Sequence, residues 1–352
     1  MSRKSLVVFL FVILGCGGKV GDGASSNGND AGGPGGSGTP SSGSSGNSGA
    51  DSGGGGTLTE LARGQSGPSA IAVDATRVYW TNVAGGILSV LNVPIGGGTP
   101  IVIASGQGIP SAIAVDATSV YWTVYESSSP NGAVMKIPID GGNPTTLAAG
   151  QDFPQGLAVE AGSIYWTNAT SGGGNIMKVP VLGGTASTLA TGQDGVAALA
   201  VDTVNVYWTI STNVGAIVKM PLDGGMPITL ASGQDSPYGI AVGPAGLYWT
   251  NSAATGANGT VMDVSINGGA VTTLVGGQSS PEGIALDESN AYWANVAGAA
   301  SVIAKVPLRG GTPIALASGQ DGPGGIAVSA TGVYWTNRGT GPADGTVMRF
   351  KQ

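Results

Sequence analysis

The sequence predicts an all-β fold: a seven-bladed β-propeller with four antiparallel strands in each blade. The dipeptide Tyr-Trp occurs seven times, includes every tryptophan of the 352-residue chain, and recurs every 41 to 44 residues. Each period also holds four short apolar runs separated by Gly and Pro, which is the pattern of β-strands. Four strands in a period of this length are typical of a propeller blade. Leucine-rich repeats are shorter, and helical repeats need long 3.6-residue periodicity, which is absent. The dipeptides begin at Tyr79, Tyr121, Tyr165, Tyr207, Tyr248, Tyr292 and Tyr334.

One unit, residues 106–148, shows the expected strands. Apolar runs cover 112–116, 120–123, 133–139 and 145–148, and a Gly141-Gly142 pair separates the last two. Because both glycines tolerate positive φ, we expect a tight primed hairpin turn at this pair. Five other units have the same pair.

The ends of the chain predict how the ring closes. Residues 57–62 match the fourth strand of other units, and residues 345–351 match a third strand. We therefore expect these two segments to pair and to complete the seventh blade, which leaves no half-open sheet edge at the seam. The propeller is expected to span 57–352.

The Tyr-Trp strands are expected to fill the space between blades. Blades converge on the axis, so the first strands need small residues such as Ala and Gly, whereas the second strands lie further out and need bulk. Burial in the core is the favoured interpretation of each tryptophan, and carbohydrate stacking is the alternative.

The first 15 residues are typical of an export signal. Arg3 and Lys4 precede an apolar run, residues 6–14, that is too short for a permanent membrane helix. The run leads into Ile13-Leu14-Gly15-Cys16, which resembles the bacterial lipobox. The resemblance implies lipidation of Cys16, which is the only cysteine, and anchoring to a membrane through several acyl chains. An ordinary cleaved signal is the alternative. Gly17 does not mark retention in the inner membrane, by analogy with enteric bacteria.

Residues 16–56 predict a disordered tether. They are almost entirely Gly, Ser, Asn, Asp, Ala and Pro, which cannot bury enough apolar surface to fold. A flexible coil of this length reaches on the order of 35 Å. The expected location is therefore extracytoplasmic, at the outer membrane or cell surface.

The net charge excludes one class of partner. Without Arg3 and Lys4, 11 basic residues face 20 acidic ones, a net charge of −9. Nucleic-acid binding needs a basic surface, and we expect none. A single cysteine allows no internal disulfide, so packing alone must stabilise the domain, which we expect to be monomeric.

The units resemble YWTD repeats of the low-density lipoprotein receptor type and the related NHL repeats. The matching residues are Tyr79-Trp80-Thr81-Asn82 and the tetrapeptides that begin at Tyr165, Tyr248 and Tyr334. Asn replaces the Asp of the receptor family, and seven units replace its usual six. The resemblance implies a propeller with binding surfaces and does not fix a ligand.

The turns before the first strands resemble those of streptogramin lyases, which are seven-bladed propellers. The resemblance rests on Pro68-Ser69-Ala70-Ile71 and on the similar segments that begin at Pro154, Pro237 and Pro281. The activity of that family is tied to histidine and a divalent metal, and this chain has no histidine. The likeness therefore implies the fold and does not carry the activity over.

The loop face that carries these prolines is the expected binding surface. The residue after the proline varies between units and is expected to point toward the axis, at the channel mouth. The ligand-contact candidates are Ser69, Ser111, Gln155, Tyr238 and Glu282.

A glutamine recurs in every unit, and an acidic residue often follows it. We expect the glutamine amides to bond backbone groups across blade junctions, with a ligand-reading ring as the alternative. The carboxylates suggest a Ca²⁺ site, because clustered oxygen ligands suit this ion; solvated turn aspartates are the alternative. The metal-site candidates are Asp152, Asp194, Asp235, Glu282 and Asp321.

Three functions fit these observations. The first is a surface-tethered module that binds a protein or glycan at the loop face. The second is a metal-assisted lyase or hydrolase, which the missing histidine and the lipidated cysteine disfavour because they remove the usual base and nucleophile. The third is a structural envelope protein without a specific ligand.

Overall fold

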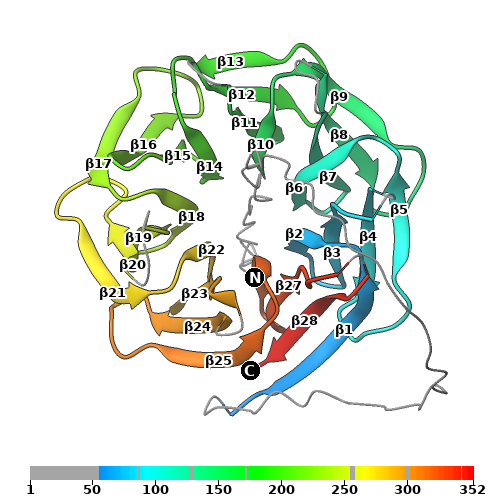
Figure 1. Ribbon diagram of the computed structural model, residues 1–352. Coiled ribbons are helices and arrows are strands. Elements are labelled where there is room, and N and C mark those ends of the chain that lie inside the picture. Colours follow the sequence, from blue (N-terminus) through cyan, green and yellow to red (C-terminus); the bar gives the residue numbers. More distant parts are fainter. Residues whose placement is uncertain are drawn as a thin grey trace, which may run out of the picture.

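The chain folds into seven four-stranded antiparallel sheets arranged around a central axis (Figure 1). The structure is a computed structural model that describes residues 55–85, 88–126, 131–170, 173–253, 258–298, 301–341 and 343–352. In each blade the first strand lies innermost and the fourth lies at the rim. Within these ranges no helix is long and apolar enough to cross a membrane.

Each blade contains four consecutive strands except the seventh, which takes its outer strand from the start of the domain. The strands of blades 1 to 3 are β2 (Pro68–Val73), β3 (Arg77–Asn82), β4 (Ser89–Pro94), β5 (Ile101–Ser105), β6 (Ile109–Val115), β7 (Ser119–Tyr125), β8 (Gly132–Pro138), β9 (Thr145–Gln151), β10 (Pro154–Glu160), β11 (Ser163–Asn168), β12 (Asn175–Pro180) and β13 (Ser187–Ala190). Those of blades 4 and 5 are β14 (Val196–Val201), β15 (Asn205–Ile210), β16 (Gly215–Pro221), β17 (Ile228–Gln234), β18 (Pro237–Gly243), β19 (Gly246–Asn251), β20 (Gly259–Val264) and β21 (Thr272–Gln278). Those of blades 6 and 7 are β22 (Pro281–Leu286), β23 (Asn290–Asn295), β24 (Ser301–Pro307), β25 (Ile314–Gln320), β26 (Pro323–Ser329), β27 (Gly332–Asn337), β28 (Gly345–Lys351) and β1 (Thr57–Gln65).

The ring closes between the two ends of the domain, which confirms the sequence prediction. β1 pairs antiparallel with β28, with Leu58 opposite Phe350 and Gln65 opposite Gly345. β1 extends three residues beyond the expected 57–62 segment and includes two register shifts. Because β1 and β28 belong to one sheet, separating the two ends would expose the edges of both strands.

The tyrosines and tryptophans of the second strands form the core between blades. All seven Tyr-Trp pairs are at most 1% exposed. They pack against small residues of the inner strands, such as Ala241 and Ala285 near Trp293. Burial of an aromatic side chain is among the largest hydrophobic contributions a single residue can make. The core interpretation of the tryptophans is therefore confirmed.

Each inner strand contains an irregularity, and in six of the seven blades a threonine bonds the N–H that it releases. In blade 3, Pro154 pairs with Asn168 but the next pair is Leu157 with Trp166, so two residues of β10 face one residue of β11. The N–H of Gly156 leaves the ladder and donates to Oγ1 of Thr167 at 2.9 Å. The Thr167 hydroxyl in turn donates to the carbonyl of Ala197 in blade 4, also at 2.9 Å. One side chain thus completes its own sheet and links it to the next.

This threonine bridge recurs around the ring. Five threonines donate to the inner strand of the following blade: Thr123, Thr167, Thr209, Thr250 and Thr336. Blade 6 has Ala294 at the equivalent position, so its side chain makes no such bond. The chain therefore contains its own comparison between a bridged and an unbridged junction.

The expected two-residue hairpin turns at the Gly-Gly pairs are wrong. Both glycines do have positive φ, 94° and 127° at Gly141 and Gly142. However, β8 ends at Pro138 and β9 begins at Thr145, so six residues connect them. The N–H of Gly141 donates to the carbonyl of Pro138, which closes a four-residue turn ahead of the second glycine. The strand-ending proline, not the glycine pair, starts the turn.

We expect Thr167→Val to lower the free energy of unfolding by about 2–4 kcal/mol, because it leaves a buried N–H and a buried carbonyl without partners. The converse change, Ala294→Thr, is expected to raise it by about 0.5–1.5 kcal/mol by adding the missing bridge. Urea denaturation of the two variants and the parent measures both changes. Equal stability of Thr167→Val and the parent would show that the bridge does not contribute.

Candidate functional site

The blade junctions on the loop face are held by glutamine, tryptophan and asparagine. Nε1 of Trp166 donates to Oε1 of Gln151 at 3.0 Å, and Nδ2 of Asn168 donates to the same oxygen at 3.0 Å. The Gln151 amide donates back to the carbonyl of Ala149. Gln151 lies in blade 2 and its two donors lie in blade 3, so the bond crosses the junction.

Six of the seven tryptophans make this bond to a glutamine. These six glutamines are structural, as expected, but the bonds across the junction join their side-chain oxygens to tryptophan side chains and not to backbone groups. The amide N–H of each donates to the backbone carbonyl two residues earlier in the chain. Val124 in blade 2 and Ile210 in blade 4 replace the asparagine, and Trp208 of blade 4 keeps its bond to Gln193. The glutamines are Gln65, Gln151, Gln193, Gln234, Gln278 and Gln320.

The residues after the prolines begin the inner strands at the same end of the ring. Their backbone is fixed, because the threonine bridges donate to the carbonyls of Gln155, Tyr238 and Glu282 at 3.0, 3.1 and 2.6 Å. The side chains of these three residues are partly exposed. Three variable side chains are therefore presented from a rigid frame, as a binding surface requires.

Ser69 and Ser111 occupy the same position in blades 1 and 2 but are only 1% exposed. The carbonyl of Ser69 accepts from Thr336, which carries the bridge across the ring seam. The Ser111 hydroxyl is buried and has no hydrogen-bond partner among the described residues. In this conformation neither side chain is available to a ligand at the surface.

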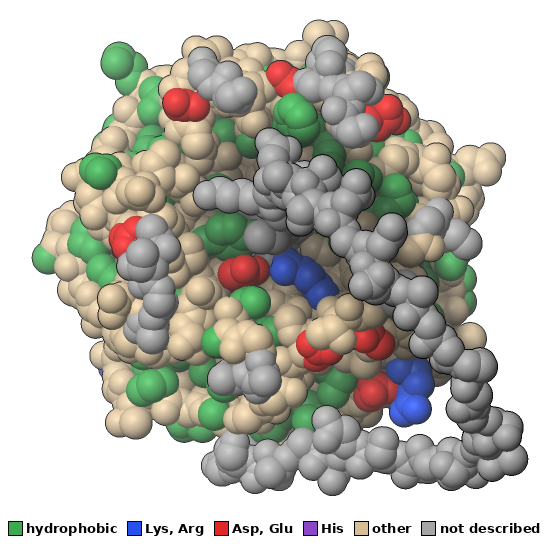
Figure 2. All heavy atoms as spheres, in the orientation of Figure 1, with side chains coloured by type: hydrophobic (Ala, Val, Ile, Leu, Met, Phe, Trp, Pro, Cys, Tyr) green, Lys and Arg blue, Asp and Glu red, His purple; other side chains and the backbone are tan. Residues whose placement is uncertain are grey.

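A charged pair that sequence analysis did not identify completes this surface. Nη2 of Arg338, which follows β27, lies 3.7 Å from Oε2 of Glu282, and the two side chains are 24% and 14% exposed. Arg338 lies across Gly324, where an added Cβ would come within 3.3 Å of Nε. Nη2 is buried and makes no hydrogen bond to a described residue. Figure 2 shows a basic and an acidic side chain side by side near the centre of the ring.

Two effects act on the pKa of Glu282. Burial raises it above its ordinary value, and the positive charge of Arg338 opposes that rise. A carboxyl group whose pKa is perturbed by burial and by one specific charged partner is a feature that recurs at functional sites. We name the surface formed by Gln155, Tyr238, Glu282 and Arg338 the mouth.

The expected ring of carboxylates is not formed as a metal-binding group. No three acidic or cysteine side chains of the described ranges lie close enough together to hold one ion. The candidates follow the glutamines, one per junction, and are therefore distributed around the ring. Asp194, Asp235 and Asp321 are exposed, Asp152 is partly buried, and Glu282 faces Arg338. The Ca²⁺ prediction gains no support from this arrangement.

An aromatic pair lies at the junction of blades 2 and 3, and sequence analysis did not identify it. The rings of Tyr125 and Phe153 are 6.5 Å apart between centroids and tilted by 39°. Phe153 is 37% exposed and has a φ of 48°, which is unusual for a bulky residue. Glycine occupies this position in blades 1, 4 and 7, at Gly67, Gly195 and Gly322. Aligning the repeats with one another would have identified Phe153 as an exception at this position.

Cys16, the signal segment 1–15 and nearly all of the tether lie outside the described residues. Their roles stay predictions.

Comparison with known proteins supports the fold. No protein-family model and no curated protein matches the sequence. An oligogalacturonate lyase solved with manganese is similar over 86% of this chain and 94% of its own, with a TM-score of 0.62 and 9% identity. TolB from Acinetobacter baumannii is similar over 70% of this chain, with a TM-score of 0.50 and 13% identity, and the match covers 65% of TolB.

A nidogen structure from a complex with laminin matches 59% of this chain and 83% of its own at 20% identity, with a TM-score of 0.49. The matches with TM-scores of 0.62 and 0.50 support a shared fold, and at these identities they indicate no shared ligand or activity.

We expect Arg338→Met to raise the pKa of Glu282 further, because the opposing charge is removed while burial persists. A carboxyl whose folded pKa lies above its unfolded value stabilises the protein when protonated, and stability falls as pH rises through the folded pKa. The variant should therefore lose stability more steeply above the ordinary value of 4.5. Nuclear magnetic resonance titration of the Glu282 carboxyl carbon, with melting at each pH, measures both effects.

Arg63→Met is the matched control, since Arg63 pairs with Glu60 at the exposed rim. An unchanged Glu282 pKa in Arg338→Met would contradict the assigned pairing.

Proposed function

We propose that the chain is an extracytoplasmic lipoprotein whose propeller binds a protein or glycan ligand at the mouth. The observation that carries the proposal is the Arg338–Glu282 pair, which is partly exposed and in which Nη2 of Arg338 makes no hydrogen bond to a described residue. Most buried polar atoms in proteins have a partner, so a buried guanidinium nitrogen without a hydrogen bond, on a side chain that is 24% exposed, marks Arg338 as a group with unused donors.

The chemistry of the mouth favours a polar ligand with an apolar face. Arg338 offers donors to a carbonyl, hydroxyl or carboxylate oxygen. The Gln155 amide both donates and accepts, and the Tyr238 ring provides a flat surface with a hydroxyl. Tyr125 and Phe153 extend the aromatic area next to Gln155 along the chain. Protein loops and glycans both present this combination of groups.

Catalysis is less well supported than binding. The sequence has no histidine and one cysteine, Cys16, which the lipobox resemblance assigns to the anchor. The described carboxylates form no group of three around a metal position. The lyase similarity concerns the fold, so we do not extend that activity to this chain.

The anchor and tether support an extracytoplasmic location. The short apolar run before Cys16 and the Gly/Ser-rich segment after it are arranged as in lipoproteins that hold a domain clear of a membrane. The acidic chain is not attracted to anionic lipid, so the acyl chains, not charge, would hold it at the surface. The monomer stays part of this proposal.

We expect a double variant, Gln155→Ala with Tyr238→Ala, to weaken ligand binding by about tenfold or more, because few residues carry most of the energy of an interface. The assay is interferometry with the full chain against cell-wall glycan fragments and purified secreted proteins. The backbone carbonyls of both residues remain in their threonine bridges, so the frame should persist, which thermal melting checks.

Leu182→Ala is the matched control, since Leu182 is 92% exposed in a turn at the opposite end of the strands. Binding that survives the double variant but is lost in Leu182→Ala would place the ligand site on the other face.

We expect Cys16→Ser to move the protein from the membrane fraction to the soluble extracytoplasmic fraction, because it removes the acylation site and thus the acyl chains. Metabolic labelling with a palmitate analogue and fractionation measure the change. Retention of the unlabelled variant in the membrane fraction would show that another segment anchors the chain.

A further inference from the structure

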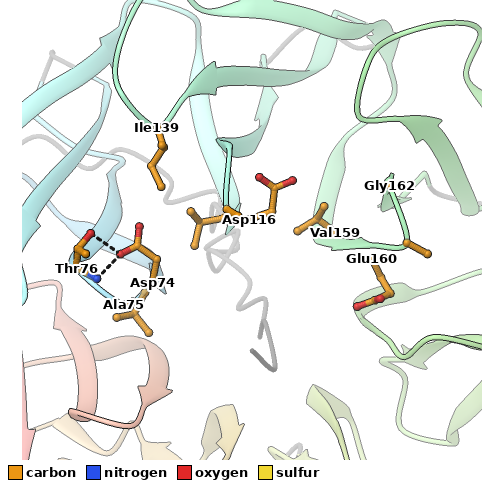
Figure 3. A pocket seen from close by; sticks show the side chains of 12 residues that line it. Asp74, Ala75, Thr76, Asp116, Ile139, Val159, Glu160 and Gly162 are labelled. Atoms are coloured by element: carbon orange, nitrogen blue, oxygen red, sulfur yellow. Dashed lines mark hydrogen bonds between the residues drawn. The ribbon is translucent and has the colours of Figure 1, made fainter. Parts of the chain in front are cut away.

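A cavity of about 560 Å³ lies on the face opposite the mouth, among the turns that join first and second strands. It is enclosed by the turns that join the first and second strands of blades 1, 2 and 3, together with Ile139 from the turn after β8 (Figure 3). Three equivalent turns thus approach one space from three neighbouring sheets.

The apolar part of the cavity comes from the ends of the inner strands. Val73, Val115 and Val159 are the same position in three successive repeats, and all three line the cavity. Ile139 and three turn alanines add further apolar surface. An aliphatic group would therefore be removed from water here.

The charge of the cavity is of one sign. Asp74, Asp116 and Glu160 line it, and no lysine or arginine does. Asp74 accepts from the backbone N–H groups of Thr76 and Arg77 through Oδ1, and from the Tyr79 hydroxyl through Oδ2. Asp116 makes the same three types of bond in blade 2.

Glu160 differs from the two aspartates. Its turn contains Ala161 with a φ of 48° and Gly162 with a φ of 72°, so this turn closes without a side-chain cap. Among the described residues Glu160 makes no hydrogen bond and no ion pair. One of the three carboxylates that line the cavity is therefore not used by the fold.

We infer that this cavity binds an alkylammonium group, such as the end of a lysine side chain or of a diamine. The aliphatic stem would lie against the three valines, and the ammonium would be bound by Glu160 in the field of Asp74 and Asp116. A bare metal ion fits less well, because it needs several oxygen ligands and those of the two aspartates are already hydrogen-bonded. The site is separate from the mouth and does not depend on the function proposed for it.

The test is a titration of the isotopically labelled full chain with pentylammonium, followed by nuclear magnetic resonance. Pentanol and pentanoate, which have the same stem, are the neutral and anionic comparisons. Pentylammonium is expected to shift the amide signals of residues 73–76, 115–117 and 159–162 and to bind at least about threefold more tightly than pentanol. Equal affinity for the ammonium and the alcohol, or shifts confined to other residues, would overturn the proposal.

Two variants and a control sharpen the test. Glu160→Gln is expected to weaken pentylammonium at least about threefold and leave pentanol unchanged, with an unaltered Tm because Glu160 holds no other group. Ala117→Trp, at an exposed turn position that lines the cavity, should block both probes by filling the space. Glu288→Gln removes the same charge from a turn of blade 6 outside the cavity, and binding should be retained. Unchanged pentylammonium affinity in Glu160→Gln would also refute the assignment.

Discussion

The buried tryptophans impose the constraint on which the ring depends. An indole N–H has to find an acceptor when it is buried. Six of the seven tryptophans find one on a glutamine of the neighbouring blade, as in the Trp249–Gln234 bond at 3.1 Å, and Trp166 and Trp249 also donate to an asparagine of their own strand. Each such bond joins the second strand of one sheet to the outer strand of the sheet before it. The hydrophobic core between blades and the order of the blades are therefore fixed by the same residues.

The sequence predicted the features that every repeat shares. The number of blades, the Tyr-Trp core and the pairing of β1 with β28 follow from patterns that recur with a fixed period, and packing acts on each copy in the same way. The structural role of glutamine was also predictable, because a buried or half-buried amide in a loop needs partners wherever it occurs. The threonine bridge was not predicted, because the threonine bonds an N–H that a strand irregularity releases, and the alternation of apolar residues does not reveal that irregularity.

Features that occur once were not predictable in the same way. Arg338 and Glu282 are 56 positions apart in sequence, and the packing of blade 6 against blade 7 brings them to 3.7 Å. The carboxylates after the glutamines were predicted to cluster around one ion. Each lies at a different blade junction, so they are distributed around the ring. The cavity opposite the mouth is lined by three turns that differ little in sequence: two carry Asp74 and Asp116, and the third carries Glu160. The two aspartates bond the backbone of their turns, whereas the turn after Glu160 closes without a carboxylate.

Several basic residues link neighbouring blades and are therefore not available to bind a partner. Of the ten lysines and arginines from Arg63 to the end of the chain, four donate to a carbonyl of the next blade: Lys136, Lys178, Lys219 and Arg349. The charged groups of Lys136, Lys178 and Arg349 also lie over tyrosine rings, with Nζ of Lys178 5.3 Å from the ring centroid of Tyr165. These charges hold the ring together and are not available to a partner. Arg338 differs from these four residues because it pairs with the Glu282 side chain of the mouth. One face of the propeller therefore carries this arginine, whereas the cavity on the opposite face is lined by carboxylates and by no lysine or arginine.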